Sequence, residues 1–226
     1  MDQTELREAI VARHAVRRYA DKPIPKEVRS LLDQEIARCN AESGLSIQAL
    51  YDDAGTFEGL LPHYGQFRGV RNRLAMVGPE GVDADIACGY YGEQVVLLAQ
   101  HLGLNSCWVG LTYSKRRVGA QITPGERLRV VVALGYGLAP GKQHRSKPLT
   151  ALGRVEGGGE WPDWFRDGVE LASLAPTGLN RQNFMFVLDG EEVRTQAGID
   201  KYSRIDLGIA KFHFEVGAGQ GPWRWG

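Results

Sequence analysis

The sequence has little of what membrane proteins, secreted disulfide proteins and metal-binding cysteine proteins require. Its longest uninterrupted aliphatic runs are 95–99 and 130–134, whereas roughly 20 apolar residues are needed to span a bilayer. The N-terminus has no basic stretch followed by an apolar one, so we expect no secretory signal. The three cysteines are dispersed, without a Cys-x-x-Cys pair, and form no disulfide framework. These absences predict a reduced, cytoplasmic protein.

An excess of either charge is also missing, because 27 Lys and Arg residues oppose 27 Asp and Glu residues. Zero net charge offers no long-range attraction to nucleic acid or to an anionic membrane, so we predict neither as a partner. The 226 residues, 43% of them hydrophobic, suffice for a folded core. Glycine is abundant, 29 residues without a collagen period, and predicts tight turns and close backbone approaches of the kind that ligand loops use.

Several motifs that carry chemistry are absent. No pair of histidines four residues apart brackets a glutamate, and no Gly-x-Ser-x-Gly elbow occurs. Gly135 and Gly137 follow an apolar run, but Pro140 stands where a dinucleotide fingerprint needs its third glycine. Gly137–Gln143 has the wrong spacing for a P-loop. We therefore predict no metal site and no catalytic side chain of these kinds.

Hydrophobic periodicity predicts mixed helix and strand in two unequal halves of one domain, 1–149 and 150–226. A glycine- and aromatic-rich loop is expected at 52–69, and a Gly/Pro-rich crossing at 135–159. The expected helices are 4–19, 26–38, 83–102, 162–174 and 206–216, and the expected strands are 46–51, 74–77, 106–109, 128–134 and 184–188. In the second helix we expect Val28, Leu31, Leu32 and Ile36 to be buried.

Two arginines close the first predicted helix. Arg13 and Arg17 are four residues apart, which on a helix places both on one face, able to converge on one anion. The planar guanidinium fork suits phosphate oxygens. Taken alone, the pentapeptide favours a solvated basic helix end instead. A second basic group, Lys142, Arg145 and Lys147, reads by itself as a solvated linker.

The loop 175–184 combines small residues with two side-chain amides, Asn180 and Gln182. An amide offers a donor and an acceptor, which suits the edge of a ring that carries alternating carbonyl and N–H groups. An ordinary turn with Asn at positive φ explains the loop equally well. A further predicted strand ends at Val109 and Gly110, where backbone N–H groups could face a ligand, while Cys107 and Trp108 are expected in the core.

In this order, these segments resemble the nitroreductase family of flavin enzymes. Residues 13–17 resemble its Arg-x-Ser-x-Arg/Lys motif, and 175–184 its loop Ala-Pro-Ser-x-x-Asn-x-Gln-Pro-Trp. The helix from Gly89 and the strand 131–137 resemble its central helix and final strand. The loop usually follows the second helix, but here it lies near the C-terminus. That displacement, with the tail 205–215, resembles a single-chain subfamily whose two halves imitate the usual homodimer.

The resemblance implies an α+β nitroreductase-like fold, with a central, mostly antiparallel sheet flanked by helices and a pseudo-dimer within one chain. It implies FMN as the cofactor, held between the halves, while the flavin itself carries the redox chemistry. One complete site results, because the second half has no Arg-x-x-x-Arg helix. The implied cofactor-binding residues are Arg13, His14, Arg17, Val109, Gly110 and Arg145 from the first half, and Pro176, Thr177, Gly178, Asn180 and Gln182 from the second.

The activity implied is transfer of reducing equivalents from NAD(P)H to a nitroaromatic, a quinone or a similar acceptor, by a monomer with an internal pseudo-dimer or by a weak homodimer. The alternative is a non-catalytic or weakly active protein that binds flavin or another small ligand. The sequence departs from the family at Ala15, where a hydroxyl contacts the flavin, and at 183–184, where Asn-Phe replaces Pro-Trp. Arg71 and Asn72 are candidates for the pyrimidine edge of the ring.

Overall fold

Two four-stranded sheets and five α-helices make up the described part of the chain, which in this computed structural model comprises residues 1–53, 57, 67–81 and 83–226. The helices are α1 (Gln3–Ala12), α2 (Lys26–Ser43), α3 (Asp83–His101), α4 (Asp163–Ala172) and α5 (Ser203–Ala218). The strands are β1 (Gln48–Leu50), β2 (Asn72–Pro79), β3 (Asn105–Val109), β4 (Glu126–Gly135), β5 (Gly153–Val155), β6 (Phe184–Asp189), β7 (Glu192–Ala197) and β8 (Arg224–Trp225).

The first sheet is antiparallel throughout, in the order β1-β2-β4-β3. Its two central strands are almost entirely buried. Burial on both faces explains why 130–134 is a continuous apolar run rather than an alternating one. The strands predicted at 74–77 and 128–134 are therefore real, although both extend further than the apolar residues indicate.

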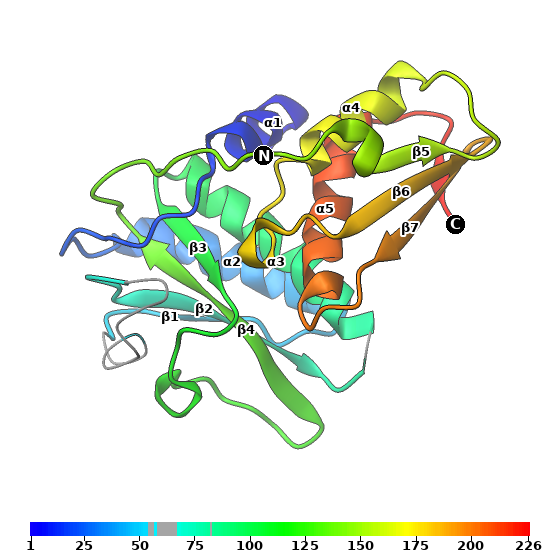
Figure 1. Cartoon of the computed structure of the whole chain (residues 1–226). Helices are drawn as coiled ribbons and strands as arrows, with labels where there is room; N and C mark the ends of the chain where they lie inside the picture. Colours follow the sequence, from blue (N-terminus) through cyan, green and yellow to red (C-terminus); the bar gives the residue numbers. More distant parts are fainter. Residues whose placement is uncertain (54–56, 58–66, 82) are drawn as a thin grey trace.

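The second sheet has the order β5-β6-β7-β8 and is mixed, because β5 pairs in parallel with β6, and β8 with β7. Only β6 was predicted from its apolar sequence. The other three strands are short or polar, so hydrophobic periodicity gave no signal for them. The expected single central sheet is thus corrected to two sheets, each with its own helices (Figure 1).

Helices α3 and α5 pack against each other between the two sheets (Figure 1). At their crossing, two glycines face each other's backbone: a Cβ on Gly89 would fall onto the carbonyl oxygen of Ile205, and a Cβ on Gly208 onto that of Ile86. The contact is reciprocal, since each glycine lies three residues after the residue that the other one touches. Only glycine permits two helix backbones to approach so closely.

Several element boundaries are also corrected, among them the predicted strand 46–51, which is shortened to β1. The predicted helix 4–19 ends at Ala12, because Arg13 adopts extended backbone (φ −72°, ψ 117°) and the following residues pair with β3. Helix α2 continues past the predicted end to Ser43, where Gly44 closes it at φ 69°. Leu31, expected in the core, is 45% exposed.

Most of the predicted loop 52–69 lies outside the described residues. In the described part, no helix is both long and apolar enough to cross a membrane.

Candidate functional site

The segment after α1 is extended and touches β3 through one isolated bridge. Ala15 forms a parallel bridge with Ser106, and the N–H of Val16 donates to the Ser106 carbonyl at 3.0 Å. The predicted helical spacing of Arg13 and Arg17 is therefore wrong. In an extended chain they still share a face, because side chains alternate, but their Cα atoms are about 13 Å apart, compared with about 6 Å on a helix.

Arg13 and Arg17 differ sharply in burial. Arg13 is 3% exposed, and its Nε lies 3.5 Å from Oε1 of Glu93, yet neither Nε nor Nη1 has a hydrogen-bond partner. Arg17 is exposed. Burial raises the pKa of the Cys107 thiol, and both guanidinium groups oppose that rise. The two cations are therefore within electrostatic range of one point on β3.

Glu93 forms the centre of a buried polar network that sequence reasoning missed. It has no exposed surface, its Oε2 accepts from Trp108 Nε1 at 2.8 Å, and its Oε1 lies 3.1 Å from His213 Nε2. The other ring nitrogen of His213 lies 3.3 Å from the carbonyl oxygen of Leu171. The available signal was a glutamate and a histidine inside otherwise apolar helix faces, where buried charges are rare unless paired.

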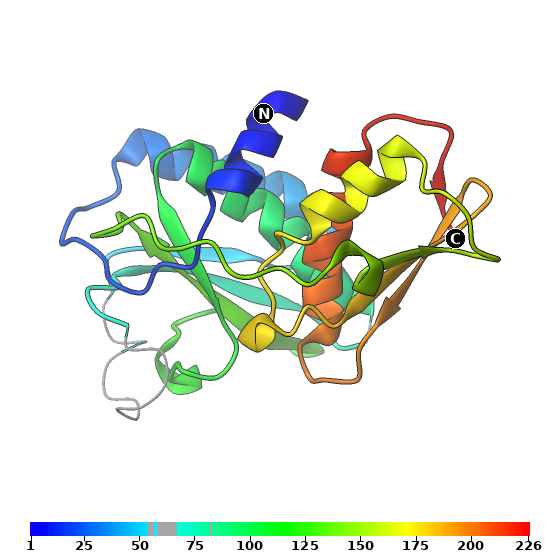
Figure 2. The ribbon, with the colours of Figure 1, turned by 45° about the horizontal axis from the view of Figure 1, so that its top comes forward.

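The crossing segment 136–148 runs from the first sheet to the second and passes the extended segment after α1 (Figure 2). Gly141 packs so closely that a Cβ there would lie 2.9 Å from the His14 Cβ. Burial lowers the pKa of His144, and neighbouring Arg13, His14 and His213 act in the same direction. Basic groups from two other parts of the chain, around Arg13 and at His213, therefore lie within electrostatic range of His144.

The loop 176–182 is attached to this crossing segment by its amides. Asn180 Nδ2 and Gln182 Nε2 donate to the Arg145 carbonyl at 2.9 and 3.0 Å, and Gln182 Oε1 accepts the Lys147 N–H at 2.8 Å. Gln182 is 1% exposed. Its amide is thus used to hold two segments together rather than left free for a ring edge. Direct flavin contacts of Asn180 and Gln182 remain predictions.

The same loop has an unusual backbone. Leu179, Asn180 and Gln182 have φ values of 54°, 55° and 45°, and Asp52 is the only other non-glycine residue with positive φ in the described part of the chain. Leu179 is also 57% exposed. Positive φ costs about 1 kcal/mol or more at a non-glycine residue and concentrates at functional sites, where the surrounding contacts hold the strained shape.

The start of α5 joins this loop to the end of β3. Oδ2 of Asp206 accepts the Gly178 N–H at 2.9 Å, and the hydroxyl of Tyr202, one turn earlier, donates to the Gly110 carbonyl. The Tyr202 ring occupies the space that a Cβ on Gly110 would need. Burial raises the pKa of Asp206 to about 7, and the charge of Asp200 adds to the rise. Neither Tyr202 nor Asp206 was among the predicted site residues.

The structure thus gathers the predicted residues into two connected groups. Arg13, His14 and the segment around Arg145 form one, and Gly110 with the loop 176–182 forms the other. Val109 is buried at the end of β3, as expected for a strand. Arg71 is paired with Asp21. Asn72 is 4% exposed and accepts the Asp52 N–H at 3.1 Å.

This fold is shared with solved nitroreductase-type structures. A protein from Thermotoga maritima, described as a "putative nitroreductase", aligns over 96% of this chain and 84% of its own, with a TM-score of 0.68 and 20% identity. A Desulfovibrio desulfuricans protein, solved in complex with FMN, covers 65% of this chain and 93% of its own, with a TM-score of 0.50 and 19% identity. At these identities the likeness shows the fold.

A third structure, from Bacteroides thetaiotaomicron and described as "Putative NADH dehydrogenase/NAD(P)H nitroreductase", covers 67% of this chain and 97% of its own, with a TM-score of 0.52 and 16% identity. No curated protein matches the sequence significantly. The family model described as "Putative TM nitroreductase" matches residues 5–218. The chain therefore belongs to this family of nitroreductases.

Proposed function

We propose that this protein is an FMN-dependent oxidoreductase that passes reducing equivalents from NAD(P)H to a nitroaromatic, a quinone or a similar acceptor. Family membership supports the oxidoreductase class. The observation that carries the cofactor assignment is the buried guanidinium of Arg13, which retains N–H groups without hydrogen-bond partners. When bound, the flavin supplies the hydride chemistry, so the protein needs no acid–base pair of its own for that step.

The residues present fit a phosphate group. Each buried N–H without a partner costs about 1–3 kcal/mol, a cost that an anion's oxygens would remove. Two nitrogens of Arg13, Nε and Nη1, carry such N–H groups, and the buried hydroxyl of Ser106, which forms the bridge with Ala15, also lacks a partner. Arg13 and His14 would hold the phosphate, with exposed Arg17 and Arg145 adding positive charge at the solvent side.

The residues around Gly110 and Gly178 fit the ring. The loop 176–182 is bound to Asp206 through the Gly178 N–H and to the crossing segment through the Asn180 amide. Its backbone with positive φ is therefore fixed before a ligand binds. Pro176, Thr177 and Gly178 would contact the ring from one half of the chain, and Val109 and Gly110 from the other. Such preorganisation lowers the entropic cost of binding a rigid ring.

The reciprocal crossing of α3 and α5 supports an internal pseudo-dimer. In a two-fold interface, if one residue contacts a second, the counterpart contact also exists, and Gly89 and Gly208 obey this rule. Two relatives align almost whole, 93% and 97%, with only 65% and 67% of this chain. The remaining third would then replace the partner subunit, and the protein would act as a monomer or as a weak homodimer.

Flavin uptake tests this function. We expect the purified protein to be yellow or to bind added FMN, and the bound flavin to be bleached by NADH or NADPH and reoxidised by a quinone. A protein that takes up no FMN would contradict the proposal. Bound flavin that neither nicotinamide cofactor reduces would leave the alternative, a flavin-binding protein without turnover.

The two arginines should contribute unequally to FMN affinity. Arg13→Lys keeps a positive charge beside Glu93 but loses the planar fork, and we expect about a tenfold loss of affinity, or ~1.4 kcal/mol. Arg17→Ala should cost less, because an exposed charge is screened by water and salt. Fluorescence titration measures both. Arg18→Ala, an exposed neighbour, serves as control and should leave the affinity unchanged; equal losses in all three would contradict the assignment.

A further inference from the structure

Four chain segments meet at one carboxylate that has no exposed surface. Glu93 on α3 accepts from Trp108 on β3, contacts His213 on α5, and lies 3.5 Å from Arg13 after α1. The crossing of α3 and α5 at Gly89 and Gly208 explains this meeting, since Glu93 lies about one turn beyond the first glycine and His213 just over one turn beyond the second.

The two members of the Arg13–Glu93 ion pair differ in how many of their polar atoms have hydrogen-bond partners. Both oxygens of Glu93 have partners, and His213, itself fully buried, is fixed by the Leu171 carbonyl on its other side. Nε and Nη1 of Arg13, in contrast, have none. A buried ion pair is rarely more stable than a well-packed apolar replacement, so stability alone does not account for a pair left incomplete. The carboxylate lies 3.5 Å from Nε and fixes that edge of the guanidinium, and the unpartnered N–H groups of Nη1 remain for a ligand.

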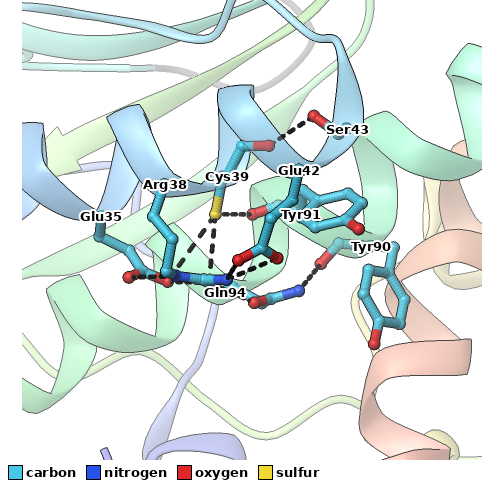
Figure 3. Close-up of polar contacts among 8 residues, drawn as sticks. All are labelled: Glu35, Arg38, Cys39, Glu42, Ser43, Tyr90, Tyr91 and Gln94. Carbon is cyan, nitrogen blue, oxygen red and sulfur yellow. Dashed lines mark hydrogen bonds and ion pairs between the residues drawn. The ribbon is translucent and has the colours of Figure 1, made fainter.

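A second network, between α2 and α3, shows what a purely structural arrangement looks like (Figure 3). Arg38 on α2 donates to Glu35 at 3.0 Å, to both oxygens of Glu42 at 2.8 Å, and to Gln94, the neighbour of Glu93, at 2.6 Å. All three of its guanidinium nitrogens have partners, and the side chain is 41% exposed. Each guanidinium nitrogen of Arg38 is therefore already used within the protein.

We propose that Glu93, fixed by Trp108 and His213, is a positioning residue that holds the Arg13 guanidinium in the orientation that receives a phosphate group. This rests on the proposed flavin function, in which that group is the FMN phosphate. Glu93, Trp108 and His213 do not touch the phosphate themselves. Because His213 belongs to α5, the second half of the chain contributes to the phosphate site as well as to the ring site.

Comparison of FMN with riboflavin, which lacks the phosphate, isolates this role. Glu93→Gln keeps an acceptor for Trp108 but removes the charge that holds Arg13. We expect FMN affinity to fall about tenfold or more, while riboflavin affinity changes less than about twofold. Glu42→Gln, which removes a carboxylate from the Arg38 network, is the matched control and should change neither affinity. Equal losses for both flavins, or no loss for FMN, would overturn the proposal.

Two smaller changes guard against a variant that fails to fold. His213→Asn and Trp108→Phe each remove one contact with Glu93 and leave its charge. Both should weaken FMN more than riboflavin, by a smaller factor than Glu93→Gln. If both variants fold and bind the two flavins with the wild-type ratio, the positioning role is wrong, whatever happens to Glu93→Gln.

Inorganic phosphate separates this proposal from the proposed function. We expect millimolar phosphate to raise the Tm of the wild-type protein, and Glu93→Gln to lose most of that rise. If no flavin binds, but phosphate stabilises the wild-type protein and not Glu93→Gln, the positioning role of Glu93 is supported and the proposed flavin function is contradicted. If flavin binds with an unchanged FMN-to-riboflavin ratio in the variants, the reverse holds. If neither ligand binds, both fall.

Discussion

Replacing Gly89 with Ala should destabilise the protein by about 3 kcal/mol or more, because the new Cβ falls onto the Ile205 carbonyl and no side chain can move aside to relieve the clash. Urea denaturation of the variant measures the loss of free energy of unfolding. Gly178→Ala is the matched control, since its nearest atom to a new Cβ is Oδ2 of Asp206 at 3.6 Å, an ordinary contact. An unchanged Gly89→Ala variant would mean that α3 and α5 do not cross here.

Because the two glycines make equivalent contacts, we expect their substitutions to have similar effects on stability. Gly208→Ala should cost about as much as Gly89→Ala, because each Cβ meets the equivalent backbone of the other helix. The double variant should cost less than the sum of the two, since the first methyl already forces the helices apart and residues in contact are not additive. Strict additivity would show that the two glycines act at separate contacts.

Asp206→Asn should stabilise the protein at pH 8 by about 4 kcal/mol and have little effect near pH 4. Burial raises the pKa of Asp206 to about 7 from its ordinary value of 3.8. The folded state therefore keeps this proton up to about pH 7, whereas the unfolded state releases it near pH 4. Stability falls as the pH rises between these values, by about 1.4 kcal/mol for each pH unit. The amide mimics the protonated acid and can still accept the Gly178 N–H.

Denaturation of wild type and variant at pH 4 and pH 8 tests this difference. Glu126 provides a control of opposite sign, because hydrogen bonds from Ser46 and Thr123 lower its pKa. Its stabilising effect is present at neutral pH and lost in acid, so Glu126→Gln should be the less stable protein at pH 8. A difference between wild type and Asp206→Asn that does not change with pH would mean that Asp206 ionises normally.

The buried carboxyl of Asp206 lowers the stability of the fold at neutral pH, and the loop 176–182 beside it contains three residues with positive φ. Both features cost stability, which indicates that this region serves a function instead. Asp206 holds Gly178, and Tyr202 holds Gly110, so the first turn of α5 connects both segments that we assign to the flavin ring. We expect Tyr202→Phe, which removes only the hydroxyl, to weaken FMN binding through Gly110 while leaving the phosphate contacts in place.

Much of the fold was predictable from local patterns. The helix 83–102 was predicted almost to the residue, because acidic residues begin it and Gly103 at φ 80° ends it. The apolar strands β2, β4 and β6 were found in the same way. The end of helix 4–19 was predicted wrongly. The residues after Ala12 have helical periodicity, but in the structure the backbone leaves the helix and forms hydrogen bonds with β3. Strands β5, β7 and β8 depend on neighbours distant in sequence, which periodicity does not register.

By itself, the sequence determined the family, the order of most elements and the segments that make up the candidate site, because motifs, glycines and hydrophobic periods are local properties. Only the tertiary structure decided what those residues do. It made one of the two arginines buried and left the other exposed, and it placed the buried one beside Glu93, which Trp108 and His213 contact. Burial and pairing depend on segments as far apart in the sequence as Arg13 and His213, so local patterns alone do not give the partners.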